Sequence, residues 1–356
     1  MKLASIVEMK LPIRSIGTVV AMSGVIVALA TGTATAEGKL SLYNWGDYIN
    51  PKVLEKFSEE FDVDVSLDTY GTNEEMLAKI QAGASGYDVV FPSVHMHDIM
   101  QQLGLLAKTN IGAHPDFKNI DPQFVRSQKD PNAEYCLPYA WGSVGIVYNR
   151  KKAEGIESWA DFFALAEKGE KIIMLDDLRE TLGVGLIMNG HSVNSRDEAE
   201  VSQAADYIVE RLGNISAFTY DSVPLVQSGD VAAAHWYVGA NIFAQEMPDV
   251  LKYIIPKEGA TMYQEDMCVL ASAPNKDNAI RFMQFYLRPE IAALNVSQQL
   301  NGTPNRPALD LIPKAIRENE SIYPPQDVMD KLEIFEDLGQ DLKLYNREWT
   351  RVKTAR

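Results

Sequence analysis

Hydrophobic and polar residues alternate along the first part of this chain with two different periods. Residues 39–45 (KLSLYNW) and 63–70 (VDVSLDTY) have the two-residue period of strands, and residues 87–91 (YDVVF) end in a continuous apolar run. Residues 51–61 repeat apolar side chains at helical spacing, and residues 73–83 form a second predicted helix. The order strand, helix, strand, helix, strand predicts a parallel sheet with right-handed crossovers.

Capping residues support both helices. Asn50 and Pro51 predict the start of the first helix, because an asparagine side chain accepts from free backbone amides and proline fits the first helical position. Thr72 and Glu75 have the spacing of a capping box for the second helix, which Gly83 is expected to end.

A second region of the same style follows before the chain returns to the first region. Its strands are predicted within residues 139–150, 170–177, 230–238 and 251–260. A strand within 266–274 and one helix over 275–300 are expected to rejoin the first region, and the tail from Pro307 is expected to be mostly helical. We therefore predict an α/β protein of two lobes, each a mainly parallel sheet flanked by helices, with a hinge and a ligand cleft between them.

The predicted boundaries follow from these crossings. Lobe 1 comprises residues 37–142 and 265–306, and lobe 2 comprises residues 143–264 and 307–356. Residues 1–36 have basic residues, an apolar stretch (VVAMSGVIVALA) and a small-residue site, which predict a signal peptide cleaved after Ala36. The apolar stretch is shorter than the ~20 residues that span a bilayer, and the segment has no cysteine for lipid attachment. We expect a soluble protein exported to the periplasm.

Charge narrows the ligand classes. The chain has a formal net charge of −16, and the predicted signal peptide holds three basic residues and one acidic residue, so the remainder carries −18. Such acidity argues against nucleic acid, whose phosphates attract Lys and Arg. It suits a cationic ligand, although solubility alone is an equally good explanation. The two cysteines, Cys136 and Cys268, fit either one disulfide or two buried thiols.

Candidate binding residues gather where strands are predicted to end. In open parallel sheets the ligand lies beyond the carboxyl ends of the strands. Five segments meet this condition, YNWGDYI, PSVHMHD, LDDLRETLG, AHWYVGAN and TMYQEDM, and none contains Lys. Their aromatic and acidic side chains are Trp45, Tyr48, Trp236, Tyr263, Asp47, Asp177, Glu180, Glu265 and Asp266.

This mixture of rings and carboxylates favours a cation with an apolar body. Carboxylates accept charge-assisted hydrogen bonds from ammonium groups, and ring faces attract cations by roughly 0.5–2 kcal/mol each. A linear polyamine has that shape. Arg179, the only basic residue in these segments, is expected to pair with Asp177 and Glu180.

Catalytic and metal sites are not supported by the motifs. His95 and His97 lie two residues apart without a third ligand at fixed spacing, so we predict no metal and no cofactor. No nucleophile elbow, phosphate-binding loop or zinc-protease motif is present. Paired acids would also suit a glycosidase, but an acidic, aromatic site serves binding equally well, and we predict a binding protein rather than an enzyme.

The chain resembles the periplasmic polyamine-binding proteins, which are class II two-lobed receptors of ABC importers for spermidine and putrescine. The resemblance covers nearly all of the chain after the signal peptide and rests on LYNWGDYI, YDVVFPS, LPYAWG, LDDLRETLG, PKEGA, NKDNAIRFMQFYLRPE, TPN and IYPPQDV. Position by position, it implies that these residues bind the ligand: Trp45, Asp47, Tyr48, Ser93, His95, Asp177, Glu180, Trp236, Tyr263 and Glu265.

Several positions depart from the family pattern. His95 replaces a family tyrosine, Asn301 falls near another, Gly46 replaces a serine or threonine, and Phe335 stands beside Glu336 where spermidine receptors have glutamine. Four carboxylates exceed the need of a diamine, so spermidine or norspermidine is expected over putrescine. The resemblance implies a monomer that delivers its ligand to an ABC permease. The alternative is a sensor that docks on the periplasmic part of a membrane cyclic-di-GMP enzyme and regulates biofilm formation.

Overall fold

The computed structural model describes residues 38–83 and 86–355. The predicted signal peptide and its cleavage site therefore lie outside the described residues. Within the described residues, no helix is long and apolar enough to cross a membrane.

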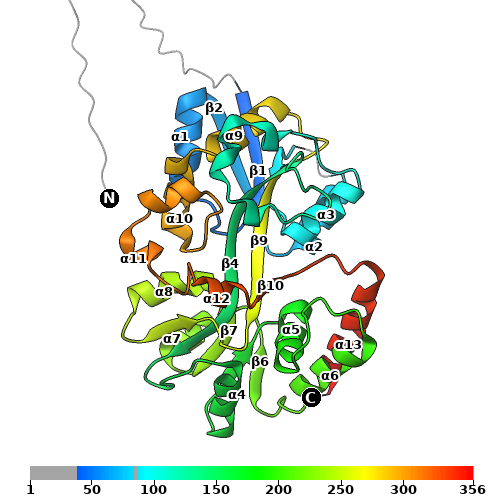
Figure 1. Ribbon diagram of the computed structural model, residues 1–356, viewed down its shortest axis with the longest axis vertical. Helices are drawn as coiled ribbons and strands as arrows, with labels where there is room; N and C mark the ends of the chain where they lie inside the picture. The colour runs from blue at the N-terminus through cyan, green and yellow to red at the C-terminus, as the bar shows by residue number, and fades with distance from the viewer. Residues whose placement is uncertain (1–37, 84–85, 356) are drawn as a thin grey trace, which may run out of the picture. The chain divides into compact units, whose positions relative to one another are not determined.

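The described strands form one mixed sheet (Figure 1). They are β1 Gly38–Trp45, β2 Val63–Tyr70, β3 Val89–Val90, β4 Cys136–Asn149, β5 Ile172–Met174, β6 Ile215–Phe218, β7 Ala233–Tyr237, β8 Leu251–Ile254, β9 Ala260–Val269 and β10 Leu332–Ile334. The main path runs in the order β2-β1-β3-β9-β4-β7-β5-β6, with β10 paired to β9 and β8 paired to β4.

The predicted sheet pattern is confirmed at both ends. β2, β1 and β3 are parallel to one another, and so are β7, β5 and β6. The long strands β4 and β9 lie between these groups and are antiparallel, so they join the two groups into a continuous sheet. The prediction of a separate sheet in each lobe missed this junction.

Helices surround both ends of the sheet (Figure 1). They are α1 Pro51–Phe61, α2 Asn73–Gln81, α3 Val94–Gln102, α4 Trp159–Glu167, α5 Leu178–Met188, α6 Glu198–Val209, α7 Val223–Ser228, α8 Asn241–Glu246, α9 Lys276–Tyr286, α10 Pro289–Gln299, α11 Lys314–Arg317, α12 Gln326–Met329 and α13 Leu342–Thr354. α1, α2, α3, α9 and α10 lie around the β1 end, and α4 to α6 and α13 lie around the β6 end.

The predicted caps are present. The Asn50 side chain accepts from the Lys52 amide at the start of α1, and the Thr72 hydroxyl accepts from the Glu75 amide at the start of α2. The Glu75 carboxylate accepts from the Gly71 amide, one residue before the position of a standard capping box. Local sequence therefore determines where these helices begin.

The predicted helix over residues 275–300 is divided into two. α9 ends at Tyr286 and α10 begins at Pro289, with the intervening Arg288 in an extended conformation. Proline disfavours helical geometry in the residue before it, and it fits the first turn of a new helix. The prediction of one helix was wrong because this breaker was overlooked.

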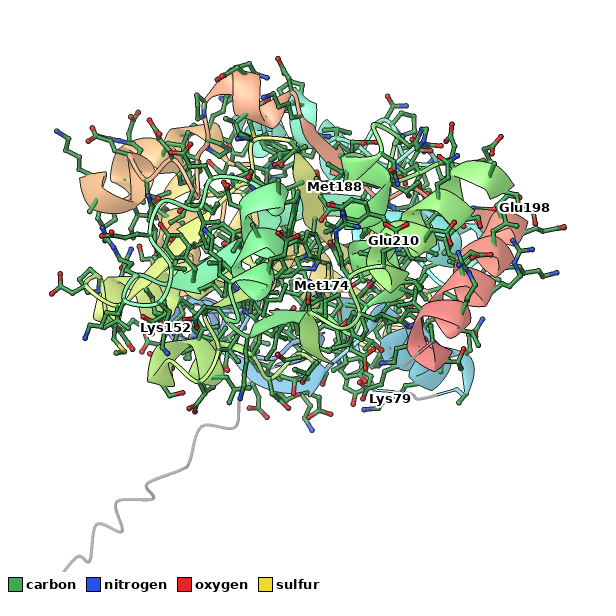
Figure 2. The ribbon with its side chains drawn as sticks, turned by 90° about the horizontal axis from the view of Figure 1, so that it is seen from below. Lys79, Lys152, Met174, Met188, Glu198 and Glu210 are labelled. Carbon is green, nitrogen blue, oxygen red and sulfur yellow. A yellow bond between two sulfur atoms is a disulfide. The ribbon has the colours of Figure 1, made fainter. Side chains whose placement is uncertain are left out.

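The tail is less helical than predicted. It includes the short strand β10, which pairs in parallel with the start of β9. Ile312, Ile316 and Ile322 pack into the hydrophobic cluster that contains β1 and α1, whereas α13 packs against α5 and α6. At this edge Arg347 of α13 forms an ion pair with Glu198 of α6, which is labelled in Figure 2.

Cys136 and Cys268 form a disulfide, which resolves the alternatives left open by the sequence. The two residues lie directly opposite each other on β4 and β9. Both are buried, and the imidazole of His97 from α3 lies near them. The disulfide thus cross-links the two strands that join both ends of the sheet.

Candidate ligand-binding site

Glu265 is the most strongly positioned of the candidate carboxylates. Its side chain is 5% exposed and lies in the middle of β9. One carboxylate oxygen accepts from the Ser93 hydroxyl at 3.1 Å, and the other accepts from the Trp45 indole at 3.2 Å. Asn73 supports Ser93 in turn, because its amide donates to the Ser93 hydroxyl oxygen at 2.9 Å. Two predicted site residues from separate segments therefore converge on the Glu265 carboxylate.

The strand-end rule accounts for most of this placement. Trp45 is the last residue of β1, Ser93 follows β3 and precedes α3, and Trp236 lies near the end of β7. Tyr263 and Glu265 differ, because they lie inside β9 rather than at its end. A crossing strand brings interior residues to the junction between the two parallel groups, a placement that the rule does not cover.

A chain of aromatic rings extends from the first strand group to the second. The Tyr48 and Tyr263 ring centroids lie 6.5 Å apart, and those of Tyr263 and Tyr237 lie 5.8 Å apart. Tyr237 contacts Trp236 at 5.9 Å, and Trp236 contacts Tyr220 at 6.3 Å. These rings provide apolar contact surface between the acidic groups at either end.

Asp177 and Glu180 occupy the second end. Asp177 caps α5, where one carboxylate oxygen accepts from the Arg179 and Glu180 amides and the other accepts from the Tyr220 hydroxyl at 3.0 Å. Glu180 is 4% exposed and accepts from the hydroxyl of Thr261, a β9 residue. Asp177 thus has a structural function in addition to its predicted contact with the ligand.

Burial changes the acidity of both glutamates. It raises the pKa of Glu265 to about 8, a rise that the Ser93 hydrogen bond opposes and the Asp266 charge reinforces. It also raises the pKa of Glu180 to about 8, with the Asp177 charge adding to the effect. Across residues 38–83 and 86–355, neither glutamate forms an ion pair with a Lys or Arg. Both buried acids therefore lack a permanent cationic partner.

The predicted pairing of Arg179 with Asp177 and Glu180 is wrong. Its guanidinium donates to the Asn194 side chain at 2.8 Å and lies over the Phe335 ring at 4.3 Å. Adjacent residues on a helix point in directions about 100° apart, so Arg179 faces away from Glu180. Arg179 therefore forms no ion pair with either acid among the described residues, although its charge lowers the pKa of Glu180.

Two predicted residues lie apart from the converging groups. The His95 ring packs edge-on against Phe335, with centroids 6.4 Å apart. Burial and the nearby Arg179 charge lower the pKa of His95 to about 4, so this imidazole is neutral at pH 7. Asp47 is exposed and has a left-handed backbone conformation with φ of 53°.

Sequence reasoning did not name Tyr220 or Tyr237 among the candidate residues, and it noted Asn301 only as a position near a family tyrosine. Tyr220 follows the short strand β6, so recognition of that strand would have placed it by the strand-end rule. Asn301 is buried, and its side-chain amide interacts with the hydroxyls of Tyr48 and Tyr263.

Comparisons with known proteins agree with this architecture. The sequence profile of the bacterial extracellular solute-binding protein family matches residues 52–322. The chain is 31% identical over 339 residues to a spermidine/putrescine-binding periplasmic protein of Salmonella typhimurium, covering 92% of this chain and 97% of that protein. It is 32% identical over 341 residues to a putrescine-binding periplasmic protein of Pseudomonas aeruginosa, covering 89% and 92%.

A solved structure extends the similarity to the fold. The spermidine/putrescine ABC transporter substrate-binding protein of Streptococcus pneumoniae superposes with a TM-score of 0.81 at 32% identity, covering 89% of this chain and 99% of that chain. The predicted two-lobed α/β fold is therefore confirmed. Such proteins bind their substrates without converting them, which agrees with the prediction that the chain is not an enzyme. The chain belongs to the family of bacterial extracellular solute-binding proteins.

Proposed function

We propose that this protein is the periplasmic polyamine receptor of an ABC importer. The observation that carries the proposal is Glu265, a buried carboxylate that is hydrogen-bonded to Trp45 and Ser93 and has no basic partner among the described residues. An ammonium group supplies the missing charge. The names of the relatives, spermidine/putrescine- and putrescine-binding proteins, support the same ligand class.

The arrangement suits a linear ligand with several amines. Rings from Tyr48 to Tyr220 cover methylene groups, while Glu265 and the Asp177–Glu180 pair meet amines at different points along the ligand. The three carboxylates of Glu265, Asp177 and Glu180 exceed the two amines of putrescine, so we favour the triamines spermidine or norspermidine. The two lobes, 37–142 with 265–306 and 143–264 with 307–356, are proposed to close around this ligand.

Calorimetry tests the ligand class directly. Residues 37–356 are titrated with spermidine, norspermidine and putrescine, with L-arginine as a cation that lacks a linear polyamine chain. We expect heat of binding for the triamines, weaker binding of putrescine and no binding of arginine. Failure to bind any of the three polyamines would overturn the proposal.

Transport tests the partner. Polyamine uptake that depends on this protein and on an ABC permease is the expected result. The sensor alternative predicts unchanged uptake, together with a polyamine-dependent change in cellular cyclic-di-GMP and biofilm. Export is tested by the mass of the protein recovered from the periplasm, which is expected to begin at Glu37.

A further inference from the structure

Tyr139 lies at an irregularity in the crossing strand β4. Pro138 pairs with Asp266 and Ala140 pairs with Glu265, so Tyr139 is an extra residue between two consecutive partners on β9. A β-bulge of this kind redirects a side chain relative to a regular strand. The bulge lies directly opposite the binding carboxylate, and the Tyr139 side chain is fully buried.

The redirected phenol contacts the backbone of the loop after β1. The Tyr139 hydroxyl donates to the carbonyl oxygen of Tyr48. The Asn295 side-chain amide of α10 donates to the same Tyr139 oxygen at 2.8 Å. The phenol therefore connects α10 to the residue whose ring begins the aromatic chain.

Asn295 also holds the far side of the loop. Its side-chain oxygen accepts from the Asn50 amide at 2.8 Å, and the Asn50 side chain donates to the Leu294 carbonyl at 2.9 Å. Immediately before the attachment at Tyr48, Asp47 adopts a left-handed conformation that costs a non-glycine residue roughly 1–2 kcal/mol. Such a conformation persists only where its surroundings hold it.

We propose that Tyr139 and Asn295 are positioning residues that fix the backbone at Tyr48 and so place its ring against Tyr263. This inference rests on the proposed function, because it assigns Tyr48 to the ligand. The bulge, the phenol and the amide contribute to affinity through the loop and make no contact with the ligand themselves.

A pair of matched substitutions tests the proposal. Tyr139→Phe removes the hydroxyl that holds the loop, whereas Tyr286→Phe removes a hydroxyl that contacts the same Asn295 amide at 3.0 Å without a bond to the loop. Both tyrosines are buried. We expect Y139F to weaken spermidine binding between about two- and tenfold and Y286F to change it less than twofold. Equal affinities of Y139F and the wild type would overturn the proposal.

A double-mutant cycle separates positioning from a general loss of stability. In a Tyr48→Ala background, Y139F is expected to cause no further loss of affinity, because the ring that it positions is gone. If Y139F lowered the spermidine affinity equally in the wild type and in the Tyr48→Ala variant, the proposal would be contradicted. Hydrogen exchange of the amides at 46–50 gives a readout without ligand: faster exchange in Y139F than in Y286F is expected, and equal exchange would overturn the inference even if the wild type bound no polyamine.

Discussion

Amide substitutions at Glu265 and Asp177 remove the negative charge of the side chain and keep its shape. Glu265→Gln keeps the shape of the side chain and its acceptor for Trp45 or Ser93 but removes the charge. Asp177→Asn likewise keeps an oxygen that can cap α5, whereas alanine would also remove the cap. We expect each amide variant to weaken triamine binding by ~2–5 kcal/mol in calorimetry, because an ammonium group loses its charged partner.

The control is an acid of the same type outside the site. Glu55 is exposed on α1, so Glu55→Gln removes one formal negative charge far from the candidate residues and is expected to leave affinity within about twofold at moderate ionic strength. Loss of affinity in all three variants would indicate an effect of overall charge. Unchanged affinity in both E265Q and D177N would contradict the site assignment.

Ligand binding is expected to release protons. Glu265 and Glu180 each have a pKa of about 8, so both are mostly protonated at pH 7 in the free protein. An ammonium group nearby lowers those pKa values, and affinity should therefore increase from pH 6 to 8 and level off above pH 8. Calorimetry in buffers of different ionisation enthalpy measures the release, which E265Q should reduce by about one proton. A buffer-independent enthalpy would contradict this coupling.

At the residue scale, sequence patterns predicted which residue types surround the candidate site better than they predicted which residues contact one another. Trp45 and Ser93 were expected near the ligand, but their convergence on Glu265 depends on a crossing strand whose path is a tertiary property. The orientation of Arg179 was mispredicted because proximity in sequence was taken as proximity in space. The position of Tyr139 in a bulge was not predicted, since a bulge depends on pairing with a strand more than a hundred residues away.

Elements were predictable where the signals were local. The caps of α1 and α2 and the parallel order of β1 to β3 follow from nearby residues. β6 was missed because four residues carry little periodicity, and the division of α9 from α10 required attention to one proline. The antiparallel junction of β4 with β9 joins distant segments, and no local pattern encodes it.

The disulfide between β4 and β9 gives a prediction at the element scale. It closes a loop of 132 residues, and such a constraint on the unfolded chain contributes ~2–5 kcal/mol. Cys136→Ala combined with Cys268→Ala is expected to lower the free energy of unfolding in urea by that amount. Wild-type protein unfolded in the presence of a thiol reductant serves as the control and should approach the double variant. Equal stability of the oxidised wild type and the double variant would contradict the expectation.

The whole molecule combines a strongly acidic chain with buried acids that have no cationic partner. Folding brings Glu265 and Glu180 out of water at the junction of both strand groups, where desolvation penalises their charged forms. Under the proposed function, the cationic ligand supplies the countercharge that makes this cost tolerable. The free protein and the complex should therefore respond differently to pH.

The stability of the ligand-free protein is predicted to fall as pH rises. The pKa of Glu265 in the folded protein, about 8, exceeds its ordinary value of 4.5. Its contribution to the free energy of unfolding is therefore fully present below pH 4.5 and is lost progressively as the pH rises to 8. Burial lowers the pKa of His97, but the Asp266 hydrogen bond and the charges of Asp266, Asp130 and Asp98 together raise it, and the loss of its proton acts in the same direction. Comparison of the wild type with E265Q isolates the glutamate, since both keep His97.

Urea unfolding at pH 5.5 and 8.5 measures this difference. Between pH 5.5 and pH 8.5, the unfolding free energy of the wild type should fall by ~2–5 kcal/mol more than that of E265Q. The reason is that the amide never has to carry a buried charge. Spermidine should restore the stability of the wild type at pH 8.5 and have little effect on E265Q at the same concentration. A pH-independent difference between the two proteins would show that Glu265 is already paired or solvated in the free state, and that its charge does not await a ligand.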